Sequence, residues 1–267
     1  MEAFWPADVD EALDILGSHP EATVVAGGTD LMVEVNYGLR FPTSVVGIRR
    51  IGELAGVEPG WIGAGATWAR LVNAPWAGLA QVARTVGSPQ IRNAGTIGGN
   101  LGTASPAGDG LTFLAAVDAT VEVVSKSDGR RSLPWDRFLT GPKRNALQPG
   151  ELILGARFPQ ELPSRQAFGK VGTRNAMVIS IVSACLTRSE DGTTRIALGS
   201  VGPTTVRARR AEEMISGERH PSDAAIAEFK RLVSEEVRPI TDHRSSALYR
   251  RHAAGVLAGR LLERCLQ

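Results

Sequence analysis

Two glycine-rich segments are the parts of this sequence whose residue types could bind a ligand through the main chain. Gly27-Gly28-Thr29 follows a short β-branched run, and Thr96-Ile97-Gly98-Gly99-Asn100 offers a second such turn. Because glycine has no Cβ, consecutive N–H groups can point into one concavity and approach a phosphate closely. A helix that starts after such a turn adds partial positive charge. The two segments together predict a main-chain site for a diphosphate, with the Thr29 hydroxyl as an extra donor.

The turns match neither of the better-known nucleotide motifs. The P-loop pattern GxxxxGK[ST] is absent, and the nearest approach to GxGxxG, Gly63-Ala64-Gly65-Ala66-Thr67-Trp68, ends in tryptophan. These observations argue against a P-loop hydrolase and against a Rossmann dinucleotide domain. Taken alone, the two glycine segments are equally compatible with tight turns of an α/β fold, so the residue pattern leaves both interpretations open.

The segments around the turns predict alternating helices and strands. Asp8 and Glu11 have the spacing of a capping box, so a helix is expected from residue 9 onward. Residues 22–26 are short and β-branched and predict a buried strand, which leads through the first glycine turn into a helix at 31–35. The order strand, glycine turn and helix is typical of α/β proteins. Further elements are expected as a helix at 111–117, a strand at 120–124 and a hairpin turn at 127–129.

The C-terminal third of the sequence has a different pattern. Residues 158–164 contain two prolines and no periodicity, which is typical of a boundary. Beyond it, strands are predicted at 178–186 and 195–201, joined by the turn Glu190-Asp191-Gly192. The remaining residues predict helices at 205–215, 222–237 and 246–266.

Composition limits the class of protein. The 267 residues are 43% hydrophobic and 22% charged, with 30 Lys and Arg against 28 Asp and Glu. This balance argues against a nucleic-acid-binding protein, and no apolar run reaches the roughly 18–20 residues of a membrane span. The N-terminus lacks the pattern of a signal peptide, which predicts a cytoplasmic location. Cys185 and Cys265 are too few to hold an iron–sulfur cluster.

Several motifs in a fixed order carry a family resemblance. Residues 26–31, 92–100 and 103–109 together resemble the FAD-binding medium subunit of the xanthine dehydrogenase and carbon monoxide dehydrogenase family of molybdenum hydroxylases. Gly199-Ser200-Val201-Gly202-Pro203 and Tyr249-Arg250-Arg251 are similar to that family's C-terminal domain. The resemblance therefore runs through nearly the whole chain.

The resemblance implies a fold with an α/β part and an α+β part. The first is a two-subdomain FAD-binding domain of the vanillyl-alcohol oxidase and MurB (PCMH) type, expected at residues 1–161 with subdomains 1–57 and 58–161. The second, expected at residues 162–267, is a CO-dehydrogenase-flavoprotein-like domain with a small antiparallel sheet and helices.

The family's motifs also imply which residues contact FAD. Asp109 would bind hydroxyls on the flavin side, Lys170 would stabilise negative charge on the reduced ring, and Ile153 would provide an apolar contact. The residues implied to bind FAD are Val24, Val25, Ala26, Gly27, Gly28, Thr29, Asp30, Leu31, Thr96, Ile97, Gly98, Gly99, Asn100, Thr103, Asp109, Ile153 and Lys170. No histidine lies in either glycine segment, so FAD is expected to be held non-covalently. Neither a catalytic side chain nor a metal ligand is expected.

Simpler interpretations stay open for three of these residues. Asp109 could cap the helix that begins near Leu111, Lys170 could be an ordinary solvated lysine, and Asn100 could stabilise its own turn through an Asx bond. Cys185 is expected to be a buried, inert thiol.

The resemblance implies an electron-transfer subunit of an oxidoreductase. Electrons would pass from [2Fe–2S] clusters of a small partner subunit through FAD to an external acceptor, while a large molybdopterin subunit carries out the hydroxylation. A dimer of heterotrimers is implied, without nucleic acid. The alternatives are a stand-alone flavin oxidoreductase of the same fold and a scaffold that has lost FAD. Length and the C-terminal pattern argue against the first alternative, and the retained glycine turns argue against the second.

Overall fold

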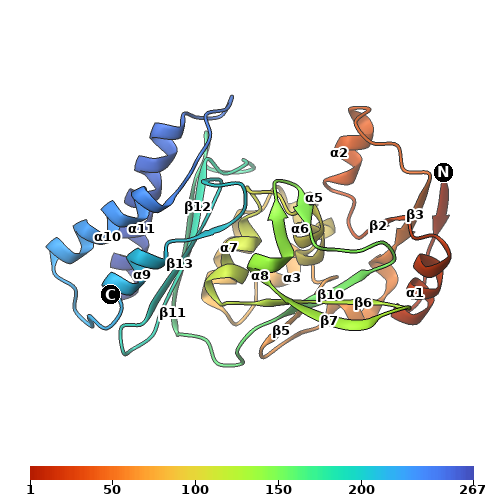
Figure 1. Cartoon of the computed structure of the whole chain (residues 1–267), viewed down its shortest axis with the longest axis horizontal. Coiled ribbons are helices and arrows are strands. Elements are labelled where there is room, and N and C mark those ends of the chain that lie inside the picture. The colour runs from red at the N-terminus through yellow and green to blue at the C-terminus, as the bar shows by residue number, and fades with distance from the viewer.

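The N-terminal segment forms a small parallel sheet in the computed structural model, which describes residues 1–267 (Figure 1). Its elements are β1 (Glu2–Phe4), α1 (Val9–Ser18), β2 (Thr23–Val25), α2 (Leu31–Asn36) and β3 (Ser44–Gly47), followed by the 3-10 turns η1 (Ile48–Arg50) and η2 (Gly52–Ala55). The strand order is β1-β3-β2, and both pairs are parallel. Asp8 caps α1 by accepting the N–H of Glu11 at 2.8 Å, which confirms the predicted helix start.

Strand β2 differs from the prediction in its burial. The prediction for residues 22–26 was a buried strand, but Thr23–Val25 are only half-buried. The reason is that β2 is the edge strand of its sheet and its residues line the main cavity. The β-branched side chains therefore border a cleft, and of the three only Val24 also packs against a hydrophobic core. Helix α2 confirms the helix expected at 31–35, although none of its residues is buried.

The middle of the chain forms a five-stranded antiparallel sheet. Its strands are β4 (Val57–Glu58), β5 (Trp61–Gly63), β6 (Thr120–Ser125), β7 (Gly129–Pro134) and β10 (Leu152–Arg157). They lie in the order β4-β5-β10-β6-β7. The predicted turn at 127–129 joins β6 to β7, with Gly129 in the left-handed region at φ 69°. The central strand β10 brings Ile153 to the wall of the main cavity.

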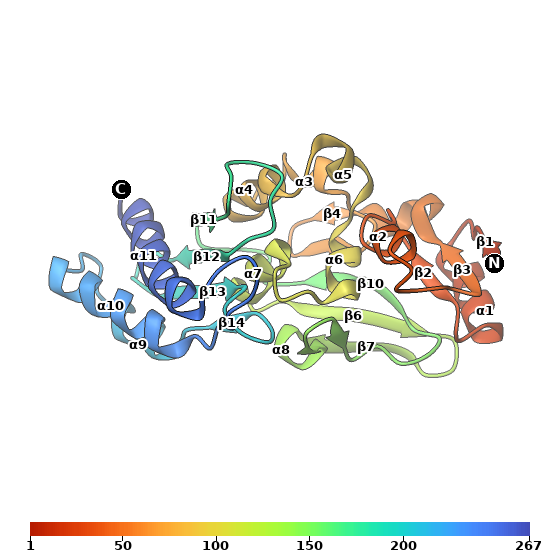
Figure 2. The same cartoon turned by 90° about the horizontal axis from the view of Figure 1, so that it is seen from above.

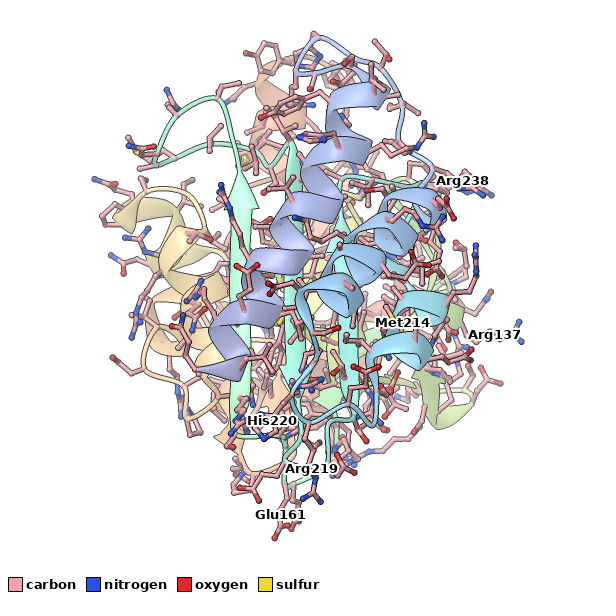
Figure 3. The ribbon with its side chains drawn as sticks, turned by 90° about the vertical axis from the view of Figure 1, so that its left-hand side faces the viewer. Arg137, Glu161, Met214, Arg219, His220 and Arg238 are labelled. Atoms are coloured by element: carbon pink, nitrogen blue, oxygen red, sulfur yellow. The ribbon has the colours of Figure 1, made fainter.

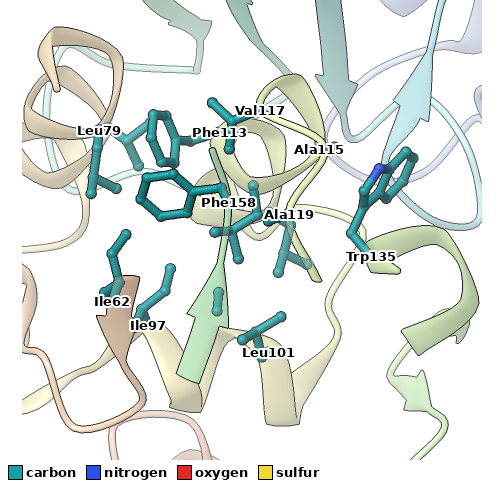
Figure 4. Packing of buried hydrophobic residues seen from close by; sticks show 14 of the residues in the cluster. Ile62, Leu79, Ile97, Leu101, Phe113, Ala115, Val117, Ala119, Trp135 and Phe158 are labelled. Carbon is teal, nitrogen blue, oxygen red and sulfur yellow. The ribbon is translucent and has the colours of Figure 1, made fainter. Parts of the chain in front are cut away.

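Short helices and a two-stranded ribbon pack beside this sheet. They are α3 (Trp68–Leu71), α4 (Ala77–Thr85), α5 (Pro89–Ala94), α6 (Ile97–Thr103), α7 (Asp109–Ala116), α8 (Trp135–Phe138), β8 (Leu139–Gly141) and β9 (Arg144–Asn145). Their buried side chains form the largest core of the molecule (Figure 4). In this core the ring of Phe158 meets the rings of Trp76 and Phe113 edge to face, at centroid distances of 4.9 and 5.9 Å. Such aromatic pairs stabilise packing beyond area burial, so these rings tie α7 and the start of α4 to the end of β10.

The C-terminal third forms a four-stranded antiparallel sheet covered by helices. Its elements are β11 (Arg165–Val171), β12 (Val182–Arg188), β13 (Thr194–Gly199), β14 (Val206–Arg207), α9 (Arg209–Ile215), α10 (Asp223–Glu236) and α11 (Ala247–Leu266). The three helices lie over one face of the sheet, and α4 and α7 contact it from the other side (Figures 1 and 3). This sheet and the parallel sheet lie at opposite ends of the molecule (Figure 2). None of the helices combines the length and the apolar character needed to cross a bilayer.

Two predicted boundaries in the C-terminal third are wrong. The strand expected at 178–186 begins only at residue 182, because the ladder with β11 ends at the pair Val171 and Val182. The helix expected at 205–215 begins only at Arg209, because residues 206–207 pair with β13 as strand β14. The helices predicted at 222–237 and 246–266 are confirmed as α10 and α11.

A buried arginine joins the C-terminal sheet to the preceding part of the chain. The side chain of Arg207 is 3% exposed and is bound by both carboxylate oxygens of Glu212. It also donates to the carbonyl of Ala115 at 2.9 Å and to Asp118 at 2.7 Å. A buried charge is tolerated only when it is paired and hydrogen-bonded, so this network ties the C-terminal end of α7 to the sheet.

Candidate functional site

A large cavity lies between the N-terminal segment and the middle of the chain. Its volume is about 630 Å³, which falls in the range of small-molecule and cofactor sites. Its walls come from the β2–α2 segment, the start of α6, the loop at 103–108 and the turn at 147–153. These segments are distant in sequence, so the cavity exists only in the folded chain.

The first glycine turn, residues 27–29, presents unpaired main-chain donors to this cavity. The N–H groups of residues 27–31 donate no hydrogen bond inside the protein, while the neighbouring Met32 N–H already bonds to the Gly28 carbonyl. All five residues line the cavity. Gly28 adopts a left-handed conformation with φ 67°, which turns the chain between β2 and α2. Since unpaired N–H groups are rare away from solvent or a ligand, this run is suited to an anionic group.

In the second glycine segment, residues 96–100, the main-chain donors of residues 97–100 are occupied within the protein. The N–H groups of Ile97 and Gly98 donate to the carbonyls of Ala66 and Ala64 at 3.1 and 2.9 Å. The hydroxyl of Thr96 caps α6 by accepting the N–H of Gly99 at 3.0 Å, and the Asn100 N–H also bonds to Thr96. The backbone and polar side chains of this segment line the cavity. The second set of N–H donors that the sequence predicted is not available there, because residues 97–100 use theirs inside the protein.

The glycines explain why the two turns lie so close together. A Cβ on Gly27 would lie 1.8 Å from the Ala94 carbonyl oxygen, just before the second segment. A Cβ on Gly98 would lie 2.6 Å from both Cβ and O of Ala64. At Gly99, which is exposed on the cavity wall, the nearest atom would be Thr96 Oγ1 at 3.4 Å. Gly27 and Gly98 thus permit backbone packing, whereas Gly99 keeps the cavity itself open.

Asn100 adds a polar side chain to the cavity wall. Its Oδ1 is buried and has no hydrogen-bond partner, and the Asx bond considered from the sequence is not formed. An unpaired buried acceptor is costly. Asn100 therefore contributes a polar residue to the cavity wall, while its Oδ1 is turned toward Gly110, where an added Cβ would lie 2.8 Å from it.

Asp109 and Lys170 form a buried ion pair beside the cavity instead of lining it. Lys170 Nζ lies 2.8 Å from Asp109 Oδ2 and also donates to the carbonyls of Thr85 and Val178. Ser180 donates to Asp109 Oδ1 at 2.6 Å. Both simpler interpretations are wrong, because Lys170 is only 10% exposed and the N-cap of α7 is Gly108, without a side-chain bond. The pair lies at the end of the loop at 103–108, whose residues do line the cavity.

The turn before β10 forms a wall that the sequence analysis missed. Glu151 accepts hydrogen bonds from Arg131 Nε at 2.5 Å and from the Gln148 N–H at 2.6 Å. Burial raises the pKa of Glu151, but the hydrogen bonds from Arg131 and Gln148 outweigh it and hold the pKa below its ordinary value. The sequence signal for this turn is the dipeptide Pro149-Gly150, which is typical of turns. It places Ile153, the predicted apolar contact, on the cavity wall.

Two cations at the cavity rim were also missed. Lys143 Nζ donates to Glu34 at 2.6 Å and lies 3.7 Å from Asp30, and Arg40 donates to Thr23 at 3.1 Å. All five residues line the cavity. Lys143 is 109 positions from Glu34, so no local pattern could have indicated the pair.

Most of the predicted FAD contacts come together in this one cavity. Of the seventeen, only Ile97, Asp109 and Lys170 do not line it, and Ile97 lies fully buried in the largest core. The cavity-lining members are Val24, Val25, Ala26, Gly27, Gly28, Thr29, Asp30, Leu31, Thr96, Gly98, Gly99, Asn100, Thr103 and Ile153.

Comparison with protein families agrees with this geometry. Residues 1–161 match the model described as the FAD binding domain in molybdopterin dehydrogenase, and residues 167–265 match the CO dehydrogenase flavoprotein C-terminal domain. The chain belongs to the family of FAD-binding subunits of the molybdenum hydroxylases, as its sequence motifs predicted. FAD is thereby confirmed as the cofactor, and oxidoreductase as the class of enzyme.

Individual relatives cover almost the whole chain. The nicotinate dehydrogenase FAD-subunit of Eubacterium barkeri is 32% identical over 81% of this chain and 80% of its own. The carbon monoxide dehydrogenase medium chain of Hydrogenophaga pseudoflava is 30% identical over 98% and 96%. Among solved structures, carbon monoxide dehydrogenase from the same organism has a TM-score of 0.90 at 29% identity, covering 99% of this chain and 96% of that one. Quinoline 2-oxidoreductase from Pseudomonas putida 86 has a TM-score of 0.91 at 26% identity, covering 100% and 97%.

Proposed function

We propose that this chain is the electron-transfer flavoprotein subunit of a molybdenum hydroxylase. In this role it passes electrons from [2Fe–2S] clusters of a partner subunit, through FAD, to an external acceptor. The observation that carries the proposal is the run of N–H groups at residues 27–31, which line the cavity and have no acceptor inside the protein. Such a run fits a diphosphate held without covalent attachment.

The arrangement of hydrophobic cores supports a division of the chain. The core between the C-terminal sheet and α9–α11 lies wholly within residues 162–267, which supports a separate C-terminal domain. The other two cores cross the proposed boundaries, because one joins α1 and β3 to the start of β10 and the largest, around α4–α7, takes in Phe168 and Cys185. We propose an FAD-binding domain of the PCMH type at residues 1–161, with subdomains 1–57 and 58–161. A C-terminal domain at 162–267 completes the chain.

The proposed contacts have different tasks. The N–H groups of residues 27–31 hold the diphosphate, and Gly98 and Gly99 let the backbone approach it. Asn100 and Thr103 supply polar contacts, and Ile153 an apolar one. Asp109 and Lys170 act through the loop at 103–108, since both are bound to protein groups beside it.

The chemistry comes from the cofactor and its orientation from the chain. When bound, FAD takes up electrons singly and releases them in pairs. The titratable residues on the cavity wall are already engaged, with Glu34 bound to Lys143 and Glu151 bound to Arg131. Neither is placed as a free acid or base. What these side chains do is hold the turns around the cavity in position.

The proposed partners follow from the relatives. Several of these are named as medium chains or subunits, such as the carbon monoxide dehydrogenase medium chain and the 6-hydroxypseudooxynicotine dehydrogenase complex subunit alpha. We propose a small [2Fe–2S] subunit and a large molybdopterin subunit, assembled as a dimer of heterotrimers in the cytoplasm.

Two measurements test this function. Titration of the purified chain with FAD is expected to reach one FAD per chain and to give the absorption bands of bound flavin, and a folded chain that binds none would overturn the proposal. Affinity purification of the tagged chain from its own cells is expected to co-elute iron and molybdenum. A flavin-loaded chain that oxidises a substrate without either metal would instead establish the stand-alone flavin oxidoreductase.

A further inference from the structure

A buried arginine on the longest helix connects the C-terminal sheet to the FAD cavity. Arg250 lies on α11, within the Tyr249-Arg250-Arg251 motif, and is 3% exposed. Its Nη1 donates to the carbonyls of Ile181 and Ser200 at 2.6 and 3.0 Å. Burying a guanidinium is costly unless its donors are satisfied, so a buried arginine on two carbonyls calls for an explanation.

An aspartate holds the same guanidinium from the opposite side. Asp242 Oδ1 accepts Arg250 Nη2 at 2.8 Å and the N–H groups of Arg244 and Ser245 at 2.9 and 3.1 Å. Burial raises the pKa of Asp242, but these hydrogen bonds outweigh it and lower the pKa to about 2. Asp242 is therefore ionised at neutral pH and keeps Arg250 oriented.

The two carbonyls bound by Arg250 lie next to two contacts with the cavity loop. Ile181 directly follows Ser180, whose hydroxyl donates to Asp109 at 2.6 Å. Ser200 donates its N–H to the Pro106 carbonyl at 2.7 Å. Ser200 is held in the left-handed region at φ 64°, which is strained for a residue with a Cβ. A strained backbone of this kind persists only where its surroundings hold it, and Arg250 supplies that support.

The two contacts enclose the part of the loop that faces the ligand. Pro106 and Asp109 flank Ala107 and Gly108, and both of these line the cavity. A shift of either contact would move this wall. Arg250 itself does not line the cavity and is remote from it in sequence, so any effect on the ligand must pass through the loop.

We propose that Arg250 is a positioning residue for FAD, acting through Ser180 and Ser200 on the loop at 103–109. The inference rests on the proposed FAD site and adds to it a support from the C-terminal helix. This proposal gives a role to the Tyr249-Arg250-Arg251 motif, which does not contact the cavity.

Two arginines provide matched controls. Arg207 is equally buried and paired, but it bonds to Glu212, Ala115 and Asp118, and none of these lines the cavity. Arg251 is the exposed neighbour of Arg250 on the same helix. Arg207→Lys reports what the loss of a buried arginine does to the fold alone, and Arg251→Lys reports the effect of a surface change on α11.

The experiment measures FAD affinity, thermal unfolding without FAD, and the visible circular dichroism of bound flavin in the full chain. Arg250→Lys is expected to weaken FAD binding by roughly 10-fold or more, because a charge-assisted hydrogen bond is lost at each of two loop supports. Its flavin dichroism is expected to change as well. Arg207→Lys and Arg251→Lys are expected to keep the FAD dissociation constant within about 2-fold of the wild type. Arg207→Lys should lower the unfolding temperature at least as much as Arg250→Lys.

Three outcomes would overturn the inference, and a fourth would overturn the proposed function. Wild-type affinity and dichroism in Arg250→Lys would overturn the inference, as would an equal loss of affinity in Arg207→Lys. Should Arg250→Lys not fold, Ser180→Ala removes only the hydroxyl that holds Asp109, and unchanged FAD affinity in that variant would also overturn it. A wild-type chain that binds no FAD would remove the proposed function itself, a result distinguishable because it appears before any variant is compared.

Discussion

The two glycine turns have similar sequences and opposite arrangements. In the first turn, at residues 27–29, the main-chain donors are free, the following helix α2 has no buried residue, and nearby side chains are half-exposed. In the second, at residues 96–100, every main-chain donor from 97 to 100 is bonded inside the protein, and Ile97, Gly98 and Leu101 of α6 are buried. The first turn thus leaves main-chain donors available to a ligand, whereas the second turn packs against the first and supports it. Glycine keeps the N–H donors of the first turn exposed, and it allows the second turn to pack closely against its neighbours.

The contact between the turns can be broken most directly at Gly27. A methyl group in Gly27→Ala would lie 1.8 Å from the Ala94 carbonyl oxygen. Overpacking against backbone is expected to cost about 3 kcal/mol in the free energy of unfolding and to abolish FAD binding, measured by urea denaturation and FAD titration. Gly17→Ala is the control, because its Cβ would meet only Lys126 Cδ at 3.6 Å within a helix. That variant should be neutral or up to about 1 kcal/mol more stable, and equal behaviour of the two would contradict the packing argument.

The neighbouring glycines of the second turn separate support from binding. Gly98→Ala places a Cβ 2.6 Å from Ala64 and is expected to lower the free energy of unfolding by about 2 kcal/mol. Gly99→Leu directs its side chain toward the cavity, where only Thr96 Oγ1 is near, so stability without FAD should change by less than about 1 kcal/mol. FAD affinity should nevertheless fall at least about 10-fold, a difference of 1.4 kcal/mol. Normal FAD binding in a folded Gly99→Leu protein would show that FAD does not lie on this wall.

The cap of the second turn should have a smaller effect. Thr96→Ala removes the hydroxyl that accepts the Gly99 N–H at 3.0 Å, and loss of an N-cap is expected to cost about 1 kcal/mol in the free energy of unfolding. Thr96→Ser keeps the acceptor and should retain most of the stability. If both substitutions were equally harmful in urea denaturation, the methyl group of Thr96 and not its hydroxyl would be the stabilising part.

The ion pair beside the first turn is expected to matter least. The hydrogen bond from Lys143 lowers the pKa of Glu34, and Lys143 is about half exposed. Lys143→Met should therefore cost under about 1 kcal/mol in the free energy of unfolding near neutral pH. A carboxyl with a lowered pKa stabilises the fold above its ordinary pKa, and this stabilisation is lost as the pH falls through the lowered value. The difference between wild type and Lys143→Met should shrink in that acid range, and a difference independent of pH would contradict an electrostatic origin.

The sequence predicted those parts of the site that depend on local pattern. The cap at Asp8, the first glycine turn and the helix after it each follow from a few adjacent residues. The cofactor followed from several motifs in a fixed order, as the family match confirms.

What the sequence did not predict depends on partners distant in the chain. Two donors of the second turn, the N–H groups of Ile97 and Gly98, are bonded to Ala66 and Ala64, some thirty positions earlier, and no pattern at 96–100 predicts these partners. Lys170 is buried because it meets Asp109 across 61 positions. Residues 206–207 form strand β14 instead of the start of the predicted helix, because they pair with the edge of β13. In each case tertiary pairing decided among locally similar alternatives.

The close approach of Gly27 to Ala94 has a consequence for biosynthesis. The N-terminal sheet leaves the ribosome first, yet its glycine turn, the proposed FAD-binding turn, packs against backbone that is translated almost seventy residues later. Domains generally fold as units while the chain emerges. A nascent chain shorter than 94 residues therefore contains the first glycine turn but not the Ala94 backbone against which this turn packs. We expect FAD to bind only after both segments have been synthesised.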